Sequence, residues 1–84
     1  VLSHERIGAL ISIEQSNSLQ DYVKTGIAVN ATVSKELLCS IFMTTTPLHD
    51  GAVIIQGDKI ACASACLNTG SVTINAELIF LTRL

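Results

Sequence analysis

The residues of this chain that could carry out chemistry gather in one stretch, Pro47 to Ile54. Within it, Asp50 is followed by Gly51 and then by an apolar run, Ala52 to Gln56, that is typical of a strand. An acid before such a run is expected at the mouth of a sheet, and the glycine lets a ligand approach the backbone closely. A carboxylate in that position can hold a metal ion or accept a proton.

Each of these residues also has a purely structural interpretation. Asp-Gly is a common turn dipeptide, and for Asp50 taken alone a turn is the favoured interpretation. His49 is either a metal ligand or a surface or packing residue. The run Thr44 to Thr46 either donates hydrogen bonds to phosphates or forms a polar loop. Glu14, at the end of a predicted strand, is expected to be solvated.

The composition indicates one small folded domain with little polar surface. Of its 84 residues, 49% are hydrophobic and 14% are charged, which excludes disorder and favours association or a missing part of the chain. The chain does not begin with Met, which also suggests a piece of something longer. A net charge of -2, with one Tyr, two Phe and no Trp, argues against nucleic-acid binding. No apolar run approaches the roughly 18 residues of a membrane span.

Three cysteines, Cys39, Cys62 and Cys66, form an odd set without a secretory signal, which indicates a reducing, cytoplasmic environment. Two thiols four residues apart, with no second pair, are a weak zinc signal. Cys62 and Cys66 are expected to share one face of a strand. We predict that the cysteines are buried and unreactive.

Hydrophobic spacing predicts the elements that position the Asp-Gly stretch. The expected helices cover residues 18–24, with Ser18 as a possible cap, and 35–42, capped by Ser34. The expected strands cover 7–14, 27–29, 52–56 and 60–67, and a further hairpin pairs 70–74 with 77–81. This order predicts an α/β or α+β domain with a mixed sheet.

The spacing of several longer segments resembles one family. These segments are Arg6 to Ile11, Ile13 to Gln15, Leu19 to Tyr22, Thr25-Gly26, Glu36 to Leu38, Thr46 to Ile55 and Lys59 to Ala61. Together they resemble the catalytic domain of bacterial diadenylate cyclases, most of all the membrane-tethered type, over about Ser3 to Leu67. The eight-residue stretch Pro47 to Ile54 around Asp50 is specific for this family, whereas the tripeptide Asp-Gly-Ala alone is not.

The resemblance implies a fold, a reaction and partners. The family fold is a mixed, twisted central sheet flanked by helices, and each protomer of a face-to-face homodimer holds one ATP. The 3′-hydroxyl of each ATP attacks the α-phosphate of the other, which gives cyclic di-AMP and pyrophosphate with the help of Mn²⁺ or Mg²⁺. The implied location is cytoplasmic, with a membrane contact only through an anchor in a parent chain.

The same resemblance assigns roles to individual residues. The positions that match the metal and catalytic motif are Asp50, with His49 beside it, and the following Gly51 and Ala52. The residues implied to contact the nucleotide are Leu10, Thr46, Leu48 and Gly51.

The sequence departs from the family pattern after Leu67. The Arg-His-Arg motif that contacts the ATP phosphates is absent, and the basic residues after Asp50 are Lys59 and Arg83. The single domain, 1–84, is therefore expected to lack an internal segment after about residue 67, through shortening or omission. Because too few cations would face the triphosphates, the chain as written is expected to be a poor cyclase. The alternative function is a catalytically dead remnant that binds a nucleotide or a protein partner.

Overall fold

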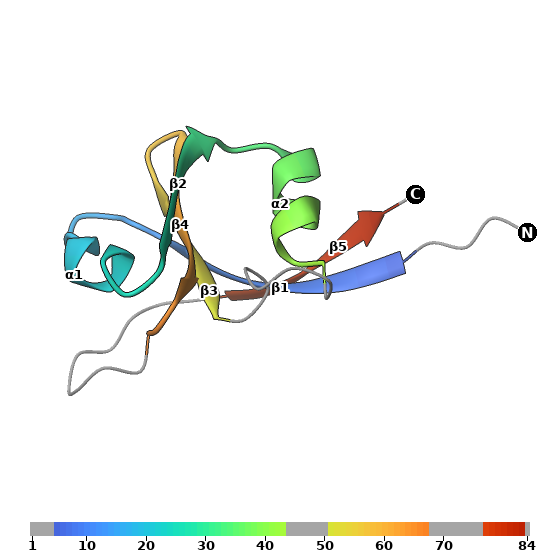
Figure 1. Ribbon diagram of the computed structural model, residues 1–84, viewed down its shortest axis with the longest axis horizontal. Coiled ribbons are helices and arrows are strands. Elements are labelled where there is room, and N and C mark those ends of the chain that lie inside the picture. Colours follow the sequence, from blue (N-terminus) through green and yellow to red (C-terminus); the bar gives the residue numbers. More distant parts are fainter. Residues whose placement is uncertain (1–4, 44–50, 68–76, 84) are drawn as a thin grey trace, which may run out of the picture.

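The computed structural model describes residues 5–43, 51–67 and 77–83, which form one five-stranded sheet and two helices (Figure 1). The strands are β1 (Glu5–Ile13), β2 (Ile27–Thr32), β3 (Ala52–Gln56), β4 (Lys59–Ala65) and β5 (Glu77–Arg83). The helices are α1 (Gln20–Val23) and α2 (Lys35–Ile41). The order across the sheet is β2-β4-β3-β1-β5. Since β1 is parallel to β3 and the other neighbours are antiparallel, the predicted mixed-sheet fold is confirmed.

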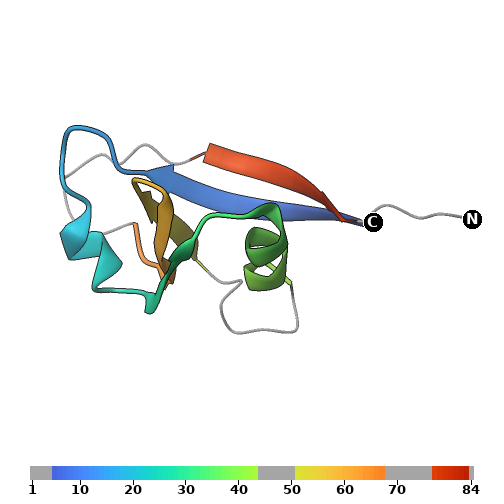
Figure 2. The same cartoon turned by 90° about the horizontal axis from the view of Figure 1, so that it is seen from above.

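Strand β1 joins the two parts of the sheet. It pairs in parallel with β3, with Ile11 beside Val53, and antiparallel with β5, from Glu5 beside Arg83 to Ile11 beside Glu77. Figure 2 shows β1 and β5 running side by side along the long direction of the molecule. The expected hairpin partner of β5, residues 70–74, lies outside the described residues, and the pairing that the structure gives β5 is with β1.

Helix α2 covers one face of the sheet. Ser34 has extended backbone and its Oγ accepts a hydrogen bond from the Leu37 N–H at 3.1 Å, so the predicted cap is confirmed. The apolar face of the helix is buried against strands β1, β3 and β4. This core cluster consists of Ala9, Ile11, Leu38, Ile41, Phe42, Val53, Ile55, Ile60 and Ala63.

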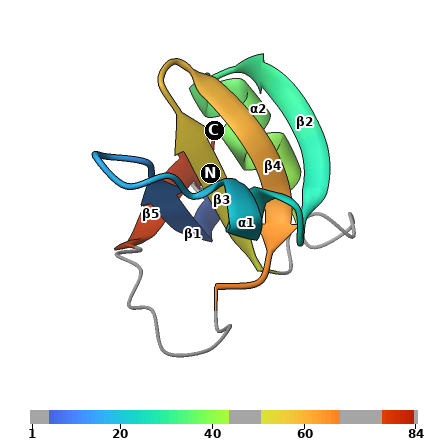
Figure 3. The same cartoon turned by 90° about the vertical axis from the view of Figure 1, so that its left-hand side faces the viewer.

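Helix α1 covers the opposite face, in front of β3 and β4 in Figure 3. Tyr22 packs there with Ile54, Cys62 and Ala65. Ile54 lies between two residues of the α2 cluster along β3, so its side chain points to the other face. The helix begins at Gln20, after the predicted start at Ser18, and the Ser18 Oγ accepts a hydrogen bond from the Gln20 N–H at 3.2 Å.

The β3–β4 hairpin confirms the turn predicted at residues 56–59. Gly57 has φ +63 and no non-glycine turn residue has a positive φ, which fits a two-residue type II′ turn. Strand β2 extends three residues beyond its predicted end at Val29, because a register shift against β4 lets pairing resume at Ala31. Asn30, at this shift, has φ +52.

Neither described helix is long and apolar enough to cross a membrane.

Candidate functional site

Gly51 stands at the start of β3 in a backbone conformation that suits glycine. Its φ is +91, in the region that L side chains rarely adopt. A Cβ built on Gly51 would lie 2.8 Å from both the Ala65 carbonyl oxygen and the Ser64 carbonyl carbon. The backbones of Gly51 and of the end of β4 therefore approach so closely that no side chain fits between them.

A bulge at the end of β4 produces this close approach. Ala52 pairs with Ala65 and Ile54 pairs with Cys62, so Val53 alone faces the two residues Ala63 and Ser64. Ser64 has φ +60, which is uncommon for a residue other than glycine, asparagine or aspartate. Bulges of this kind bend a strand and redirect its side chains, and they are frequent beside active sites. The bulge in β4 and the positive φ of Gly51 thus determine the shape of this edge of the sheet.

The structure brings together three of the residues predicted for the site. Ala52 is fully buried, and Leu10 is half-buried on β1. Strands β1 and β3 are parallel, and Ile11 pairs with Val53. The preceding residues of the two strands, Leu10 and Ala52, therefore also lie side by side. Gly51 is exposed next to them. The remaining predicted site residues, Thr46, Leu48, His49 and Asp50, lie outside the described residues.

The described residues contain no group of three histidine, cysteine or acidic side chains that could hold a metal ion. The predicted ligands Asp50 and His49 are outside this set, but their donor chemistry fits the expected metal. A carboxylate oxygen suits both Mg²⁺ and Mn²⁺, and an imidazole nitrogen is also a common ligand of transition metals.

Glu14 has a structural role that the sequence analysis missed. Its Oε2 accepts hydrogen bonds from the Leu19 N–H at 2.8 Å and from the Gln56 Nε2 at 2.9 Å. The Leu19 backbone contact, followed by the Gln56 contact, lowers the pKa of Glu14 below its ordinary value, against a smaller opposing effect of burial. Glu14 is partly exposed, and its carboxylate also ties the start of α1 to the end of β3, a role that was not predicted.

We expect Glu14→Gln to destabilise the fold at neutral pH and to reduce its sensitivity to acid. Because the folded pKa lies below the ordinary value, ionised Glu14 stabilises the fold above pH about 4.5, and this stability is lost as pH falls through the folded pKa. The stability difference between wild type and variant should therefore shrink on acidification. Urea unfolding at several pH values measures it. Gln20→Ala, which removes only the neighbouring acceptor of Gln56, should keep the wild-type acid response.

The cysteines divide into two classes. Cys39 and Cys62 are buried, as predicted, whereas Cys66 is exposed, so the prediction is wrong for Cys66. Cys62 and Ala65 share a core cluster because the bulge adds a residue between them, and this offset moves Cys66 away from the face expected for it. Burial raises the pKa of the Cys62 thiol, against a weaker effect of its hydrogen bond with the Ile54 backbone.

We expect a thiol reagent to label the native chain quickly at Cys66 and slowly at the two buried cysteines. The time course of reaction with a chromogenic disulfide measures both phases. Cys66→Ser should abolish the fast phase and leave the slow one. A fast phase that survives in Cys66→Ser would contradict the burial of Cys39 and Cys62.

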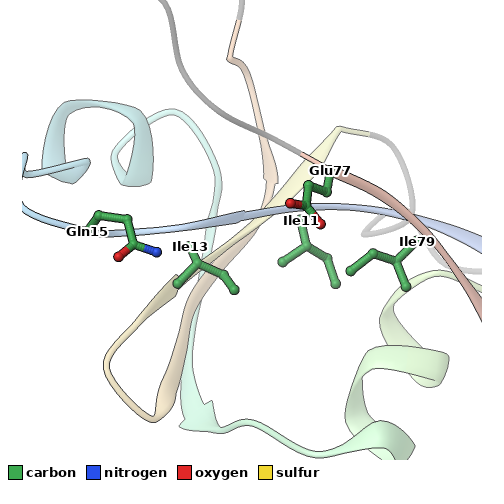
Figure 4. A pocket seen from close by; sticks show the side chains of 5 residues that line it. All are labelled: Ile11, Ile13, Gln15, Glu77 and Ile79. Atoms are coloured by element: carbon green, nitrogen blue, oxygen red, sulfur yellow. The ribbon is translucent and has the colours of Figure 1, made fainter.

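A pocket of about 240 Å³ lies beside β1 and β5 (Figure 4). The residues that line it are Ile11, Ile13, Gln15, Glu77 and Ile79. Ile13 and Ile79 are partly exposed, at 52% and 37%. Within the described part of the chain, the lining includes none of the residues predicted for the site, although Ile11 pairs with Val53, two residues after Gly51.

The fold belongs to a class of mixed-sheet α+β domains for which crystal structures exist. DacA from Staphylococcus aureus is 52% identical, with a TM-score of 0.72 over 79% of this chain and 44% of that chain. A hypothetical membrane spanning protein from Bacillus cereus is 38% identical, with a TM-score of 0.66 over 79% of this chain and 34% of that chain.

The chain belongs to the DisA bacterial checkpoint controller nucleotide-binding family, whose model matches residues 1–79. The diadenylate cyclase of Listeria monocytogenes (strain 10403S) and the cyclic di-AMP synthase CdaA of Bacillus subtilis (strain 168) are each 52% identical over 66 residues. Each match covers 79% of this chain and 24% of the relative, so the chain spans about a quarter of their length. The resemblance to bacterial diadenylate cyclases, including the CdaA type, is confirmed.

Proposed function

We propose that this chain is the part of a diadenylate cyclase domain that carries the metal-binding corner, in a reaction that condenses two ATP molecules into cyclic di-AMP. In each half-reaction a 3′-hydroxyl oxygen forms a bond to the α-phosphorus of the other ATP, and the bond from that phosphorus to the bridging oxygen breaks. Pyrophosphate leaves, and the Asp50 carboxylate receives the hydroxyl proton. Two half-reactions close the ring and release two pyrophosphates.

The geometry of Gly51 is the observation that carries this proposal. Asp50 directly precedes a residue with positive φ that is pressed against the bulged end of β4. A carboxylate therefore adjoins a backbone with no Cβ, at the start of a buried strand, in a chain of this family. In this proposal Asp50 binds a cation there, and a ribose or phosphate approaches the exposed backbone of Gly51 from the side away from β4.

The chain's other residues have supporting roles in this proposal. Asp50 and His49 hold Mn²⁺ or Mg²⁺, which when bound offsets phosphate charge and lowers the pKa of a bound hydroxyl. Leu10 and Leu48 contact the adenine. Thr46 donates a hydrogen bond to a phosphate. Ala52, buried against Ala65, keeps the start of β3 in place.

The proposed assembly is a face-to-face homodimer in the cytoplasm. Such a dimer holds two nucleotides in line for attack and converts a rare encounter into a fixed arrangement. Any membrane contact is made through an anchor in a parent chain. No nucleic acid takes part.

The missing arginines limit the turnover expected of these 84 residues. With no Arg-His-Arg motif, we propose that the single domain, 1–84, lacks a phosphate-binding segment after about residue 67. Pyrophosphate departure then loses most of its electrostatic stabilisation. The absence of this motif favours the second candidate function, a catalytically dead remnant that binds nucleotide or a protein partner.

Calorimetric titration of ATP in the presence of Mn²⁺, combined with chromatographic detection of cyclic di-AMP, tests the proposal. We expect Mn²⁺-dependent ATP binding that weakens at least about tenfold in Asp50→Asn, because a charged metal ligand is lost. Asp58→Asn, which makes the same change in the exposed β3–β4 turn, should bind like wild type.

The outcomes separate the two functions. Cyclic di-AMP formation that requires Asp50 supports the cyclase, whereas Mn²⁺-dependent binding without product supports the remnant. Equal ATP binding by wild type and Asp50→Asn would contradict the assignment of Asp50 in both.

A further inference from the structure

The bulged end of β4 lies between two glycines that directly precede the neighbouring strands. Gly51, at the start of β3, approaches the carbonyl groups of Ser64 and Ala65. Gly26 directly precedes β2 on the other side of β4, and a Cβ built on it would lie 2.5 Å from the Ala63 carbonyl oxygen and 3.2 Å from the Ala65 Cα. Any sideways movement of this segment of β4 therefore alters its contact with Gly51.

One side chain fixes the residue that follows this segment. The Thr25 Oγ1 donates a hydrogen bond to the Tyr22 carbonyl oxygen at 2.6 Å and accepts one from the Cys66 N–H at 2.9 Å. Donation to Tyr22 orients the remaining lone pairs of the hydroxyl toward the Cys66 amide, and each bond polarises the other. The hydroxyl thus provides an acceptor for the Cys66 N–H, directly after the end of β4 at Ala65.

Helix α1, which ends just before Thr25, is itself packed against β4. Tyr22 is buried in the cluster that contains Cys62 and Ala65, with Leu19 and Val23 packed against it. The Thr25 hydroxyl is therefore attached at one end to an element that is itself packed on β4. The strained φ of Ser64 lies two residues before Cys66, so the hydrogen bond acts where the backbone needs outside support.

We propose that Thr25 is a positioning residue for Gly51, which follows the proposed metal ligand Asp50 in the sequence. By accepting a hydrogen bond from the Cys66 N–H, the Thr25 hydroxyl stabilises the bulge at the end of β4. The Gly51 backbone packs against this bulge. Because Asp50 directly precedes Gly51 in the sequence, a displaced Gly51 would weaken the proposed metal binding. This inference rests on the proposed function for its effect on metal binding, and on the geometry alone for its effect on Gly51.

The matched variants Thr25→Val and Thr25→Ser test this role in the isotopically labelled chain. Valine keeps the shape of threonine without the hydroxyl, and serine keeps the hydroxyl. In Thr25→Val we expect amide hydrogen exchange at Cys66 to be about tenfold faster. We also expect the Gly51 amide resonance to shift, and Mn²⁺ affinity, measured from paramagnetic broadening of that resonance, to fall about fivefold, as for one lost hydrogen bond. Thr25→Ser should restore all three values.

Two results would overturn the inference. One is faster exchange at Cys66 with an unchanged Gly51 resonance, which would make the hydrogen bond a local one. The other is a loss of Mn²⁺ affinity in Thr25→Ser equal to that in Thr25→Val. If wild type itself shows no Mn²⁺ broadening at Gly51, the proposed metal site is wrong, and the Gly51 resonance in the variants still decides the positioning role. If Thr25→Val does not fold, Thr25→Ala removes the same acceptor with less bulk.

Discussion

Gly51→Ala is expected to destabilise the chain by about 3 kcal/mol or more. A side chain at φ +91 costs roughly 1–3 kcal/mol in backbone strain. The new Cβ would also lie 2.8 Å from two backbone atoms of β4, which cannot rotate away, and overpacking adds about 1–3 kcal/mol. The whole stability of a domain this size is about 4–12 kcal/mol, so the variant should lose about a quarter of its stability or more.

Gly57→Ala is the matched control for this prediction. Gly57 also has a positive φ, +63, but a Cβ there meets nothing within 4 Å, so strain is its only expected cost, about 1 kcal/mol. Urea unfolding of both variants compares the two costs directly. Equal losses of stability would show that the contact between Gly51 and the end of β4 is looser than described.

Gly26→Ala is the second substitution with a large expected effect. Gly26 has no positive φ, so its cost arises from packing alone. A Cβ would lie 2.5 Å from the Ala63 carbonyl oxygen and 3.1 Å from the Cys62 sulfur, inside a buried part of the sheet. We expect a loss of about 2–3 kcal/mol, equivalent to a decrease in Tm of about 10–20 °C for a chain of this length.

The three glycine variants together separate strain from packing. Gly57→Ala measures strain, Gly26→Ala measures packing, and Gly51→Ala should cost about the sum of the two. Differential scanning calorimetry under one buffer condition gives all three values of Tm. If Gly26→Ala unfolds at the wild-type temperature, β2 and β4 are not in the close contact that the Thr25 inference requires.

Much of the fold could be predicted from local patterns. The Ser34 cap, the apolar spacing of α2 and the β3–β4 turn are each specified by a few adjacent residues, and they occur where predicted. The pairing of β5 with β1 was missed, because strand pairing between distant segments leaves no mark in local periodicity. The burial of Cys62 without Cys66 was missed for a related reason: a bulge shifts the alternation by one residue.

The candidate site could be predicted only in part. Asp-Gly before an apolar run indicated Gly51 and Ala52, since glycine and strand signals are both local. Thr25 and Gly26 were part of the family resemblance, but their contacts with β4 could not be predicted, because those contacts join residues about 40 positions apart. Glu14 has the same character: its two hydrogen-bond partners, Leu19 and Gln56, come together only in the folded chain.

The position of β1 in the sheet has a consequence for how this chain folds. Ile11 pairs with Val53, 42 residues later, and Glu5 pairs with Arg83, almost at the other end of the chain. Strand β1 can therefore complete its pairing only after the later strands β3 and β5 have been synthesised. Closing such long loops slows folding, and an unpaired apolar strand is prone to aggregate in the meantime. The chain should consequently fold slowly for its size and depend on chaperones during synthesis.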